Sequence, residues 1–282
     1  MRLTPLLALL LASCASGHAS GGRPHVVAGA YPFAWLAEKV GGPDVTVTDL
    51  VKPGVEPHDV ELSPRQVGEV KEATLVVHLE GFQPAVDDAV EGAHGYDLSS
   101  VVDQLSEGDA RTRDPHVWLD PVLMQRMAEG IAGRLASADP AHAAGYRARA
   151  AALGRTLFAL DASIRTTLSG CASQDVVTSH AAFAYFAARY HLVQRGISGL
   201  SPDADPSPKR LAEVAGFART HHVTTIFFES LVSPKLARTV ASEVGARTAV
   251  LDPIESVRGS DDYLVVMRRN ADTLRTALRC SG

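Results

Sequence analysis

Short runs rich in β-branched residues alternate with helical stretches along most of this 282-residue chain. Strands that alternate with helices form parallel sheets with crossover helices. The expected strands lie at 25–30, 45–51, 73–79 and 96–100 in the first half, and at 175–179, 191–198, 223–229 and 246–252 in the second. The expected helices between them lie at 31–40, 63–72, 83–90, 181–190, 207–221 and 234–244. The pattern predicts an α/β fold with two similar parallel-sheet domains.

A long helical region separates the two halves of the chain. Pro121 opens this region and Asp139-Pro140 interrupts it. Beyond the interruption, apolar side chains recur at three- and four-residue steps up to Leu168, and Gly170 follows as a stop signal. A helix of roughly 28 residues is about 42 Å long at 1.5 Å per residue. We therefore expect a rigid backbone helix that joins the two domains.

The first residues, MRLTPLLALLLASCASG, have the composition of an export signal. The apolar run from Leu3 to Leu11 is too short to cross the ~30 Å hydrocarbon core as a helix. The sequence LASC that ends at Cys14 resembles the bacterial lipobox, in which the cysteine is lipidated; ordinary cleavage nearby, with Cys14 discarded or free, is the alternative. We expect an exported lipoprotein that faces the periplasm or extracellular side and contacts the membrane through its N-terminal lipid only.

These observations divide the chain into four segments. The expected segments are the signal peptide, lipobox and tether at 1–24, an N-terminal α/β domain at 25–120, a linking helical region at 121–170, and a C-terminal α/β domain at 171–282. The formal net charge is −5, and the Lys and Arg residues are scattered along the chain. Because no basic stripe is present to neutralise phosphates, nucleic acid is not an expected partner.

Cys171 and Cys280 are the two cysteines that remain when Cys14 is set aside. In an exported chain, an even pair of cysteines most simply forms a disulfide. Two reduced thiols, or thiolate metal ligands, are the alternatives, although neither cysteine has a partner at metal-binding spacing. The disulfide would join the start of the second half to the C-terminal end.

Three histidines and one aspartate lie where parallel strands would deliver them to one cleft: His58, His116, His180 and Asp252. Ligands of open parallel sheets bind outside the carboxyl ends of the strands. Two facing domains would each bring two of these side chains to a shared site. Imidazole suits zinc, and four protein ligands form a closed tetrahedral site. The spacing therefore predicts a metal site in the interdomain cleft.

Six motifs extend over nearly the whole mature chain: GVEPHD, DPHVWLDP, TSHAAFAYFA, GLSPDADPSPKRL, FFESLVSPKLARTVASEVGA and VLDPIE. In order and spacing they resemble the zinc and manganese receptors of bacterial ABC importers, which are solute-binding lipoproteins. The resemblance implies two α/β domains joined by a rigid helix, with the metal between them. Such a receptor would deliver its metal to an ABC transporter permease, and we expect the chain to be a monomer. The family's ligands carry over to His58, His116, His180 and Asp252.

The ligand set favours Zn²⁺ over Mn²⁺. Manganese receptors of this family usually place a Glu where this chain has His180, and harder Mn²⁺ prefers oxygen. Some zinc receptors have a Glu directly before the first histidine, but this chain has Pro57, so Asp252 is expected to supply the oxygen. The segment Gly92 to Asp114 is short and holds only His94. Any metal-scavenging role of a longer loop would be absent or delegated to a partner such as a metallochaperone.

Three other functions are alternatives to a zinc receptor. A manganese receptor of the same family and a surface adhesin are the closest alternatives. A secreted zinc hydrolase is less favoured, because a catalytic zinc needs an open position for water and a general base. Asp114, Asp120 and Glu229 are the residues expected to orient the imidazoles.

Overall fold

The computed structural model describes residues 22–102, 105, 113–257 and 261–282; Cys14 and the expected signal lie outside this part of the chain. Two four-stranded sheets form the framework, with strand orders β2-β1-β3-β4 and β6-β5-β7-β8, and every neighbouring pair is parallel. The strands are β1 (His25–Ala28), β2 (Thr46–Asp49), β3 (Leu75–His78), β4 (Gly95–Asp97), β5 (Asp175–Thr178), β6 (Val193–Gly196), β7 (Thr225–Phe228) and β8 (Arg247–Val250). The predicted α/β class with two similar domains is confirmed.

The helices lie where the sequence pattern predicts them, with one addition. They are α1 (Tyr31–Gly41), α2 (Pro64–Glu72), α3 (Pro84–Val90), α4 (Pro121–Ala138), α5 (Ala143–Thr167), α6 (Ala184–Tyr190), α7 (Pro208–Thr220), α8 (Lys235–Val244) and α9 (Tyr263–Leu278). Short 3₁₀ turns are η1 (Gly42–Asp44), η2 (Leu98–Val101), η3 (Val117–Leu119) and η4 (Pro140–His142). Helix α9 was not predicted. Asp262 caps its N-terminus by accepting a hydrogen bond from the backbone of Val265.

Both faces of each sheet are buried, as parallel sheets require. In β1, Val26 belongs to the large central core and Val27 to a smaller core under α2 and α3. In the second sheet, Val176 faces the central core, whereas Val177 packs with residues of α7 and α8. The central core includes residues of both sheets and of α1, α4, α5 and α9. One continuous apolar core therefore joins the two domains.

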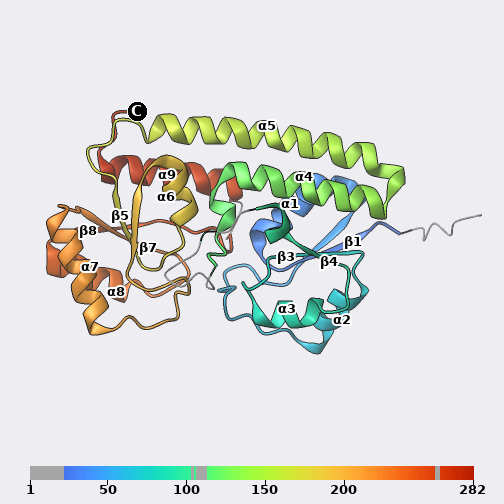
Figure 1. The fold of residues 1–282 in the computed structure, drawn as a ribbon, viewed down its shortest axis with the longest axis horizontal. Coiled ribbons are helices and arrows are strands. Elements are labelled where there is room, and N and C mark those ends of the chain that lie inside the picture. Colours follow the sequence, from blue (N-terminus) through green and yellow to red (C-terminus); the bar gives the residue numbers. More distant parts are fainter. Residues whose placement is uncertain (1–21, 103–104, 106–112, 258–260) are drawn as a thin grey trace, which may run out of the picture.

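Helix α5 spans both domains in Figure 1, with α4 beneath it over the N-terminal sheet and α9 beneath it on the C-terminal side. It has 25 residues, or about 38 Å at 1.5 Å per residue. The interruption at Pro140 separates it from α4, as predicted. The apolar stripe is also in place, since Tyr146, Leu157 and Ile164 are all buried.

Charged groups attach α5 to each domain. On the N-terminal side, Arg149 donates to the carbonyl oxygens of Val40 and Gly41, at the end of α1, with all N···O distances 2.7 Å, and it pairs with Asp44 at the same distance. These bonds satisfy carbonyls that a helix end leaves unpaired. The connector is therefore fixed to the first domain by polar contacts as well as by the core.

On the C-terminal side, Asp161 of α5 accepts two hydrogen bonds from Arg189 of α6, at 2.9 and 2.8 Å. The pair is bidentate, the stronger geometry for an Arg–carboxylate contact. Asp161 is buried. Burial opposes ionisation of Asp161, but Arg189 and then Arg165 outweigh it and lower the pKa of the carboxyl group.

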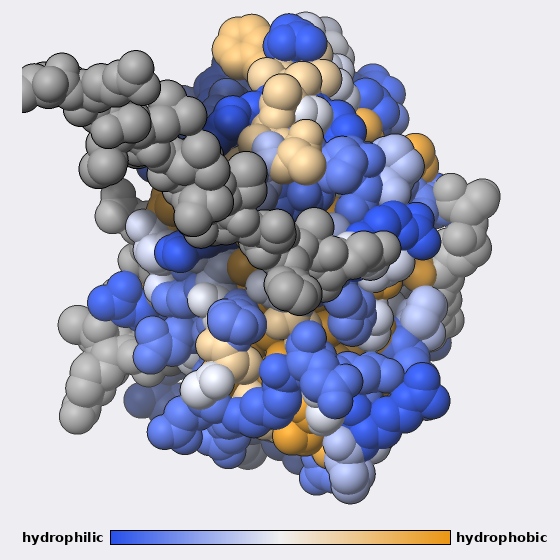
Figure 2. All heavy atoms as spheres, turned by 90° about the vertical axis from the view of Figure 1, so that its right-hand side faces the viewer, coloured by the Kyte–Doolittle hydropathy of each residue, from blue (hydrophilic) through white to orange (hydrophobic). Residues whose placement is uncertain are grey.

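Cys171 and Cys280 form the disulfide that the cysteine count predicts. It joins the segment after α5 to the segment after α9, so the C-terminal helix is covalently held beside the connector. Among the described residues, no helix is long and apolar enough to cross a membrane. Figure 2 shows the end of the molecule formed by the N-terminal domain, where the visible surface is mainly hydrophilic and apolar residues form separate small patches.

Candidate metal centre

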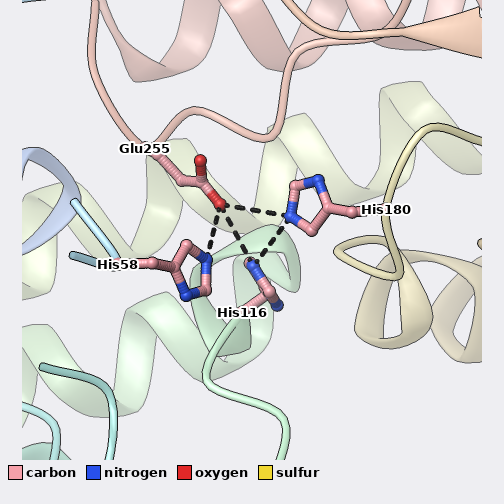
Figure 3. A group of neighbouring side chains, drawn as sticks. All are labelled: His58, His116, His180 and Glu255. Atoms are coloured by element: carbon pink, nitrogen blue, oxygen red, sulfur yellow. Dashed lines mark hydrogen bonds and ion pairs between the residues drawn. The ribbon is translucent and has the colours of Figure 1, made fainter. Parts of the chain in front are cut away.

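Four side chains from four separate loops converge between the two domains (Figure 3). His58 lies in the loop after β2, and His116 lies directly before η3. His180 follows β5 by two residues, and Glu255 lies in the loop after β8. Two of the four therefore come from segments before α4 and two from segments after α5. Within the described residues, this is the group of His, Cys, Asp and Glu whose donor atoms lie close enough to share one metal ion.

The Nε2 atoms of all three histidines face one carboxylate oxygen. Glu255 Oε1 lies 3.3 Å from His58 Nε2, 3.1 Å from His116 Nε2 and 3.4 Å from His180 Nε2. The Nε2 atoms of His116 and His180 lie 3.3 Å apart. With Zn–N distances of 2.0–2.1 Å, donor atoms of a tetrahedral site are about 3.3–3.4 Å apart. These four distances match the donor spacing of a tetrahedral zinc ion, and all four donor atoms lie within 4.8 Å of one another.

Second contacts orient two of the imidazoles. His116 Nδ1 lies 2.7 Å from Asp114 Oδ1, and His180 Nδ1 lies 2.6 Å from Glu229 Oε1. Ser179 donates its hydroxyl to the same Glu229 oxygen. A carboxylate on Nδ1 leaves Nε2 free to face a metal and raises the basicity of the ring. Asp114 and Glu229 thus lie where they were expected to act.

The pKa values of two histidines are raised by these carboxylates. Burial would lower the pKa of His180, but the charge and hydrogen bond of Glu229, with Glu255, raise it to about 10. For His116, burial again lowers the pKa, but hydrogen bonds from the ring to Asp114 and Glu255 outweigh it, and the pKa rises. Because a metal ligand must be deprotonated, a metal that binds here competes with protons for these rings.

The pKa values of the other titratable groups of the centre shift in different directions. Burial lowers the pKa of His58, against the opposing effect of Glu255. Burial also disfavours ionised Glu255, but hydrogen bonds from His116, His180 and His58 hold the pKa of Glu255 well below its usual range. Burial, followed by the charge of Glu255, raises the pKa of Glu56 to about 8. The centre therefore holds one buried carboxylate anion, Glu255, beside three imidazoles.

The structure does not place Asp252 with the three histidines. Its Oδ1 accepts a hydrogen bond from the backbone of Ile254 at 2.8 Å, and its Oδ2 accepts one from the Ser230 hydroxyl at 2.9 Å. Glu255, three residues further along the chain, occupies the position that was expected for Asp252. The expectation was based on Pro57 preceding His58 and on Asp252 ending a strand; the chain turns after Asp252 and brings the next carboxylate into the cleft.

Asp120 was also expected near the imidazoles, but it serves α4 instead. Its Oδ1 accepts a hydrogen bond from the backbone of Val122 at 2.7 Å and so caps the N-terminus of that helix. Glu255 itself belongs to the motif VLDPIE. The sequence signal that could have identified it is an Asp-Pro turn followed by an acidic residue, since such a turn redirects the chain away from the strand axis.

Comparison with known proteins assigns the chain to a family. Residues 26–277 match the profile of the ZnuA family, which is described as the zinc-uptake complex component A, periplasmic. The chain belongs to this family. The resemblance to zinc receptors of ABC importers that the motifs indicate is thereby confirmed.

Two curated relatives show how far the likeness extends. The chain is 32% identical over 300 residues to the high-affinity zinc uptake system protein ZnuA of Bacillus subtilis, a match that covers 96% of this chain and 94% of the relative. It is also 32% identical to the zinc-binding lipoprotein AdcA of Streptococcus pneumoniae, covering 97% of this chain but 59% of AdcA. The chain therefore spans little more than half the length of AdcA.

Solved structures share the fold of this family member. The laminin-binding protein Lmb of Streptococcus agalactiae, described as bifunctional with adhesin and metal-transporting activity, superimposes with a TM-score of 0.84 at 32% identity, covering 90% of this chain and 99% of Lmb. Zn(II)-bound AdcA from Streptococcus pneumoniae superimposes with a TM-score of 0.80 at 32% identity, covering 93% of this chain and 59% of AdcA.

Proposed function

We propose that this chain is a high-affinity extracytoplasmic receptor that captures Zn²⁺ and delivers it to the permease of an ABC importer. The observation that carries the proposal is the convergence of three Nε2 atoms on Glu255 Oε1, at 3.1 to 3.4 Å, between two domains. Membership in the family of periplasmic zinc-uptake components supports it.

The zinc ligands in this proposal are His58, His116, His180 and Glu255. Their donor chemistry suits the ion, because imidazole nitrogen and one carboxylate oxygen are ordinary zinc ligands. Glu255 Oε2 is buried without a hydrogen-bond partner among the described residues, as expected of a carboxylate that can accept a cation. Of the ligands first expected, Asp252 is replaced by Glu255.

Zinc is favoured over manganese as the cargo. The third imidazole, His180, stands where a manganese receptor would need oxygen, and its ring is held by Glu229. Manganese prefers carboxylate, carbonyl and water oxygens, whereas imidazole favours the later divalent metals. A manganese receptor is therefore the weaker alternative within the same family.

Transport is favoured over catalysis because four protein donors fill a tetrahedral shell. A catalytic zinc keeps one position open for water. The raised pKa values of His116 and His180 arise from carboxylates that orient the rings toward the ion. The family and its relatives are zinc-uptake and zinc-binding proteins. We accordingly assign no catalytic residue.

The proposal includes the way in which the receptor is held and used. Lipid on Cys14 anchors an otherwise soluble monomer, and the tether ends at residue 24. The boundaries 25–120, 121–170 and 171–282 then define the first domain, the linking helices and the second domain. The partner is the membrane permease, and a metallochaperone is a second candidate partner because the chain has no long His-rich loop. The lipoprotein name of AdcA supports the anchored location.

Surface adhesion is a second candidate function, favoured by the likeness to Lmb, which is described as both adhesin and metal transporter. The two functions are separable by experiment. A soluble form without the lipid anchor should bind one zinc ion tightly, and deletion of the gene should reduce zinc uptake. Binding to laminin without any zinc-uptake defect would favour adhesion.

Metal titration of protein purified without added metal tests the proposal. One Zn²⁺ per chain should bind far more tightly than Mn²⁺, and His116→Ala should weaken zinc binding strongly while circular dichroism shows the fold intact. Unchanged calorimetric affinity in His116→Ala would remove the basis of the proposal.

A further inference from the structure

The turn that presents Glu255 to the histidines has an unusual backbone. Ile254, directly before Glu255, has φ of 61° and is fully buried. A β-branched residue rarely adopts this left-handed conformation, because its side chain crowds the backbone. Such a conformation persists only where surrounding contacts determine it. The contacts around this turn are therefore expected to control where Glu255 points.

Asp252 supplies the contact that closes the turn. Its Oδ1 accepts a hydrogen bond from the Ile254 backbone N–H at 2.8 Å, two residues ahead. This is the Asx-turn pattern, in which an Asp side chain takes the place of a backbone carbonyl. Pro253 between them has its φ fixed near −65° by its ring. Ser230 donates to the other carboxylate oxygen and keeps the Asp252 side chain in place.

One element from each domain, α9 and η3, contacts the turn that Asp252 closes. Asn270 of α9, itself buried, accepts from the Asp252 backbone N–H at 3.0 Å and donates to the Asp252 carbonyl oxygen at 2.6 Å. Trp118 of η3 donates its indole N–H to the Pro253 carbonyl oxygen at 2.7 Å. Contacts from α9 and from the N-terminal domain therefore fix the two residues that precede Ile254.

The residue after Glu255, Ser256, is also held by a hydrogen bond. The backbone N–H of Gly54, in the loop that leads to His58, donates to the Ser256 hydroxyl at 2.6 Å. Glu255 is thus flanked on both sides by hydrogen-bonded residues, and its Oε1 faces the three histidines.

We infer that Asp252 is a positioning residue whose Asx turn aims Glu255 at the zinc ion, and that it acts through its hydrogen bond to Ile254, not through its charge. This inference rests on the proposed zinc-receptor function. It gives the two carboxylates of the Asp-Pro-Ile-Glu segment separate roles, with the first shaping the turn and the second binding the metal.

A graded series of variants tests the inference by zinc affinity and zinc dissociation rate, measured by competition with a chelator. Asp252→Asn keeps an oxygen that accepts from Ile254 and removes the charge, so its zinc Kd should stay within about threefold of wild type. Asp252→Ser keeps a weaker acceptor and should be intermediate. Asp252→Ala removes the acceptor and should weaken binding about 10- to 100-fold, the range for lost outer contacts of metal ligands.

Asp49 provides the matched control. Its Oδ1 accepts from the backbone N–H of Val51 at 2.9 Å, which is the same two-residue turn at the end of a strand in the other domain. Asp49→Ala should therefore leave the zinc Kd near the wild-type value. Circular dichroism of each metal-free variant distinguishes loss of the fold from loss of zinc affinity. If Asp252→Ala does not fold, the zinc affinities of Asp252→Asn and Asp252→Ser are compared instead.

The outcomes distinguish this inference from the function on which it rests. Asp252→Asn binding as weakly as Glu255→Gln would show that the charge of Asp252 acts on the metal and would overturn the positioning role. Wild-type affinity in Asp252→Ala, with weak binding in Glu255→Gln, would show that the turn is dispensable while the receptor function stands. Wild-type affinity in Glu255→Gln as well would instead overturn the proposed ligand set.

Discussion

The Nε2 atom of His58 lies 3.3 Å from Oε1 of Glu255, although 197 residues separate the two in the chain. One residue belongs to the first domain and the other to the second. Their proximity depends on the helices and the common core that fix one domain against the other. Zinc binding should therefore respond both to the ligands and to the groups that orient them.

Glu229→Gln should weaken zinc binding about 10- to 100-fold, because Glu229 holds His180 Nδ1 at 2.6 Å and stabilises the tautomer that presents Nε2. Chelator competition measures the change. Asp120→Asn is the control, since Asp120 caps α4 and an asparagine caps equally well. Equal affinity in wild type and Glu229→Gln would show that this contact does not serve the metal.

Zinc affinity should rise with pH. Neighbouring carboxylates raise the pKa of His180 to about 10 and also raise the pKa of His116, so protons compete with zinc for these rings. Zinc must displace these protons, so the apparent Kd should fall about tenfold per pH unit for each proton released. Calorimetry at pH 6 to 8, in buffers of different ionisation enthalpy, counts the protons. A pH-independent Kd without proton release would contradict the arrangement.

Metal preference should depend on the ring at position 180. His180→Glu exchanges an imidazole for a carboxylate and should reduce the ratio of zinc to manganese affinity. Because Glu229 contacts this side chain, the single variant would place two carboxylates together. The double variant His180→Glu with Glu229→Gln removes that repulsion and should shift the ratio further. A ratio unchanged in both variants would show that position 180 does not select the metal.

Loss of the disulfide should affect stability and leave the metal centre working. Replacing Cys171 and Cys280 by Ser should lower the free energy of unfolding by about 2–4 kcal/mol. Denaturant unfolding of the metal-free protein measures this. Zinc affinity should stay near wild type, because Asn270 and the turn that it holds remain anchored from within the core. A large loss of affinity in the double variant would show that the covalent link positions the second domain.

Arg189→Ala should destabilise the protein by about 1–3 kcal/mol, because it leaves the buried Asp161 carboxylate with fewer donors. The lowered pKa of Asp161 gives the sign of the pH dependence. The stabilisation is present above the usual aspartate pKa of about 3.9 and is lost as the pH falls through the lower pKa of the folded state. Unfolding at pH 7 and at pH 3 tests this, and an equal difference at both values would contradict it.

The fold was predictable because the sequence patterns of its strands and helices are local and occur repeatedly along the chain. Alternating runs such as residues 73–79 show where strands lie, and Pro140 shows where the connector breaks. The predicted strands are longer than the observed ones, and the end of the expected strand 96–100 instead forms the 3₁₀ turn η2. Helix α9 was missed, although Asp262 marks its start. The other helices of the two domains were recognised because each lies between two strands, whereas no strand follows α9.

The candidate site was predictable for the three histidines that follow parallel strands and not for the carboxylate that follows a tight turn. His58, His116 and His180 were predicted as ligands from position, and the structure brings them together. Asp252 is the acidic residue at the end of the expected strand 246–252, but β8 ends at Val250 and Glu255 lies further along the loop. The left-handed backbone conformation of Ile254 changes the direction of the chain before Glu255. The spacing of apolar and polar residues does not predict that conformation. Tertiary contacts from Asn270 and Trp118 determine it.

A crystal structure of the zinc-loaded protein tests the central claim most directly. The account predicts one zinc ion between the domains, bound by Nε2 of His58, His116 and His180 and by a carboxylate oxygen of Glu255, with Asp252 still bonded to the Ile254 backbone. A zinc ion bound by Asp252, with Glu255 turned out of the centre, would contradict it.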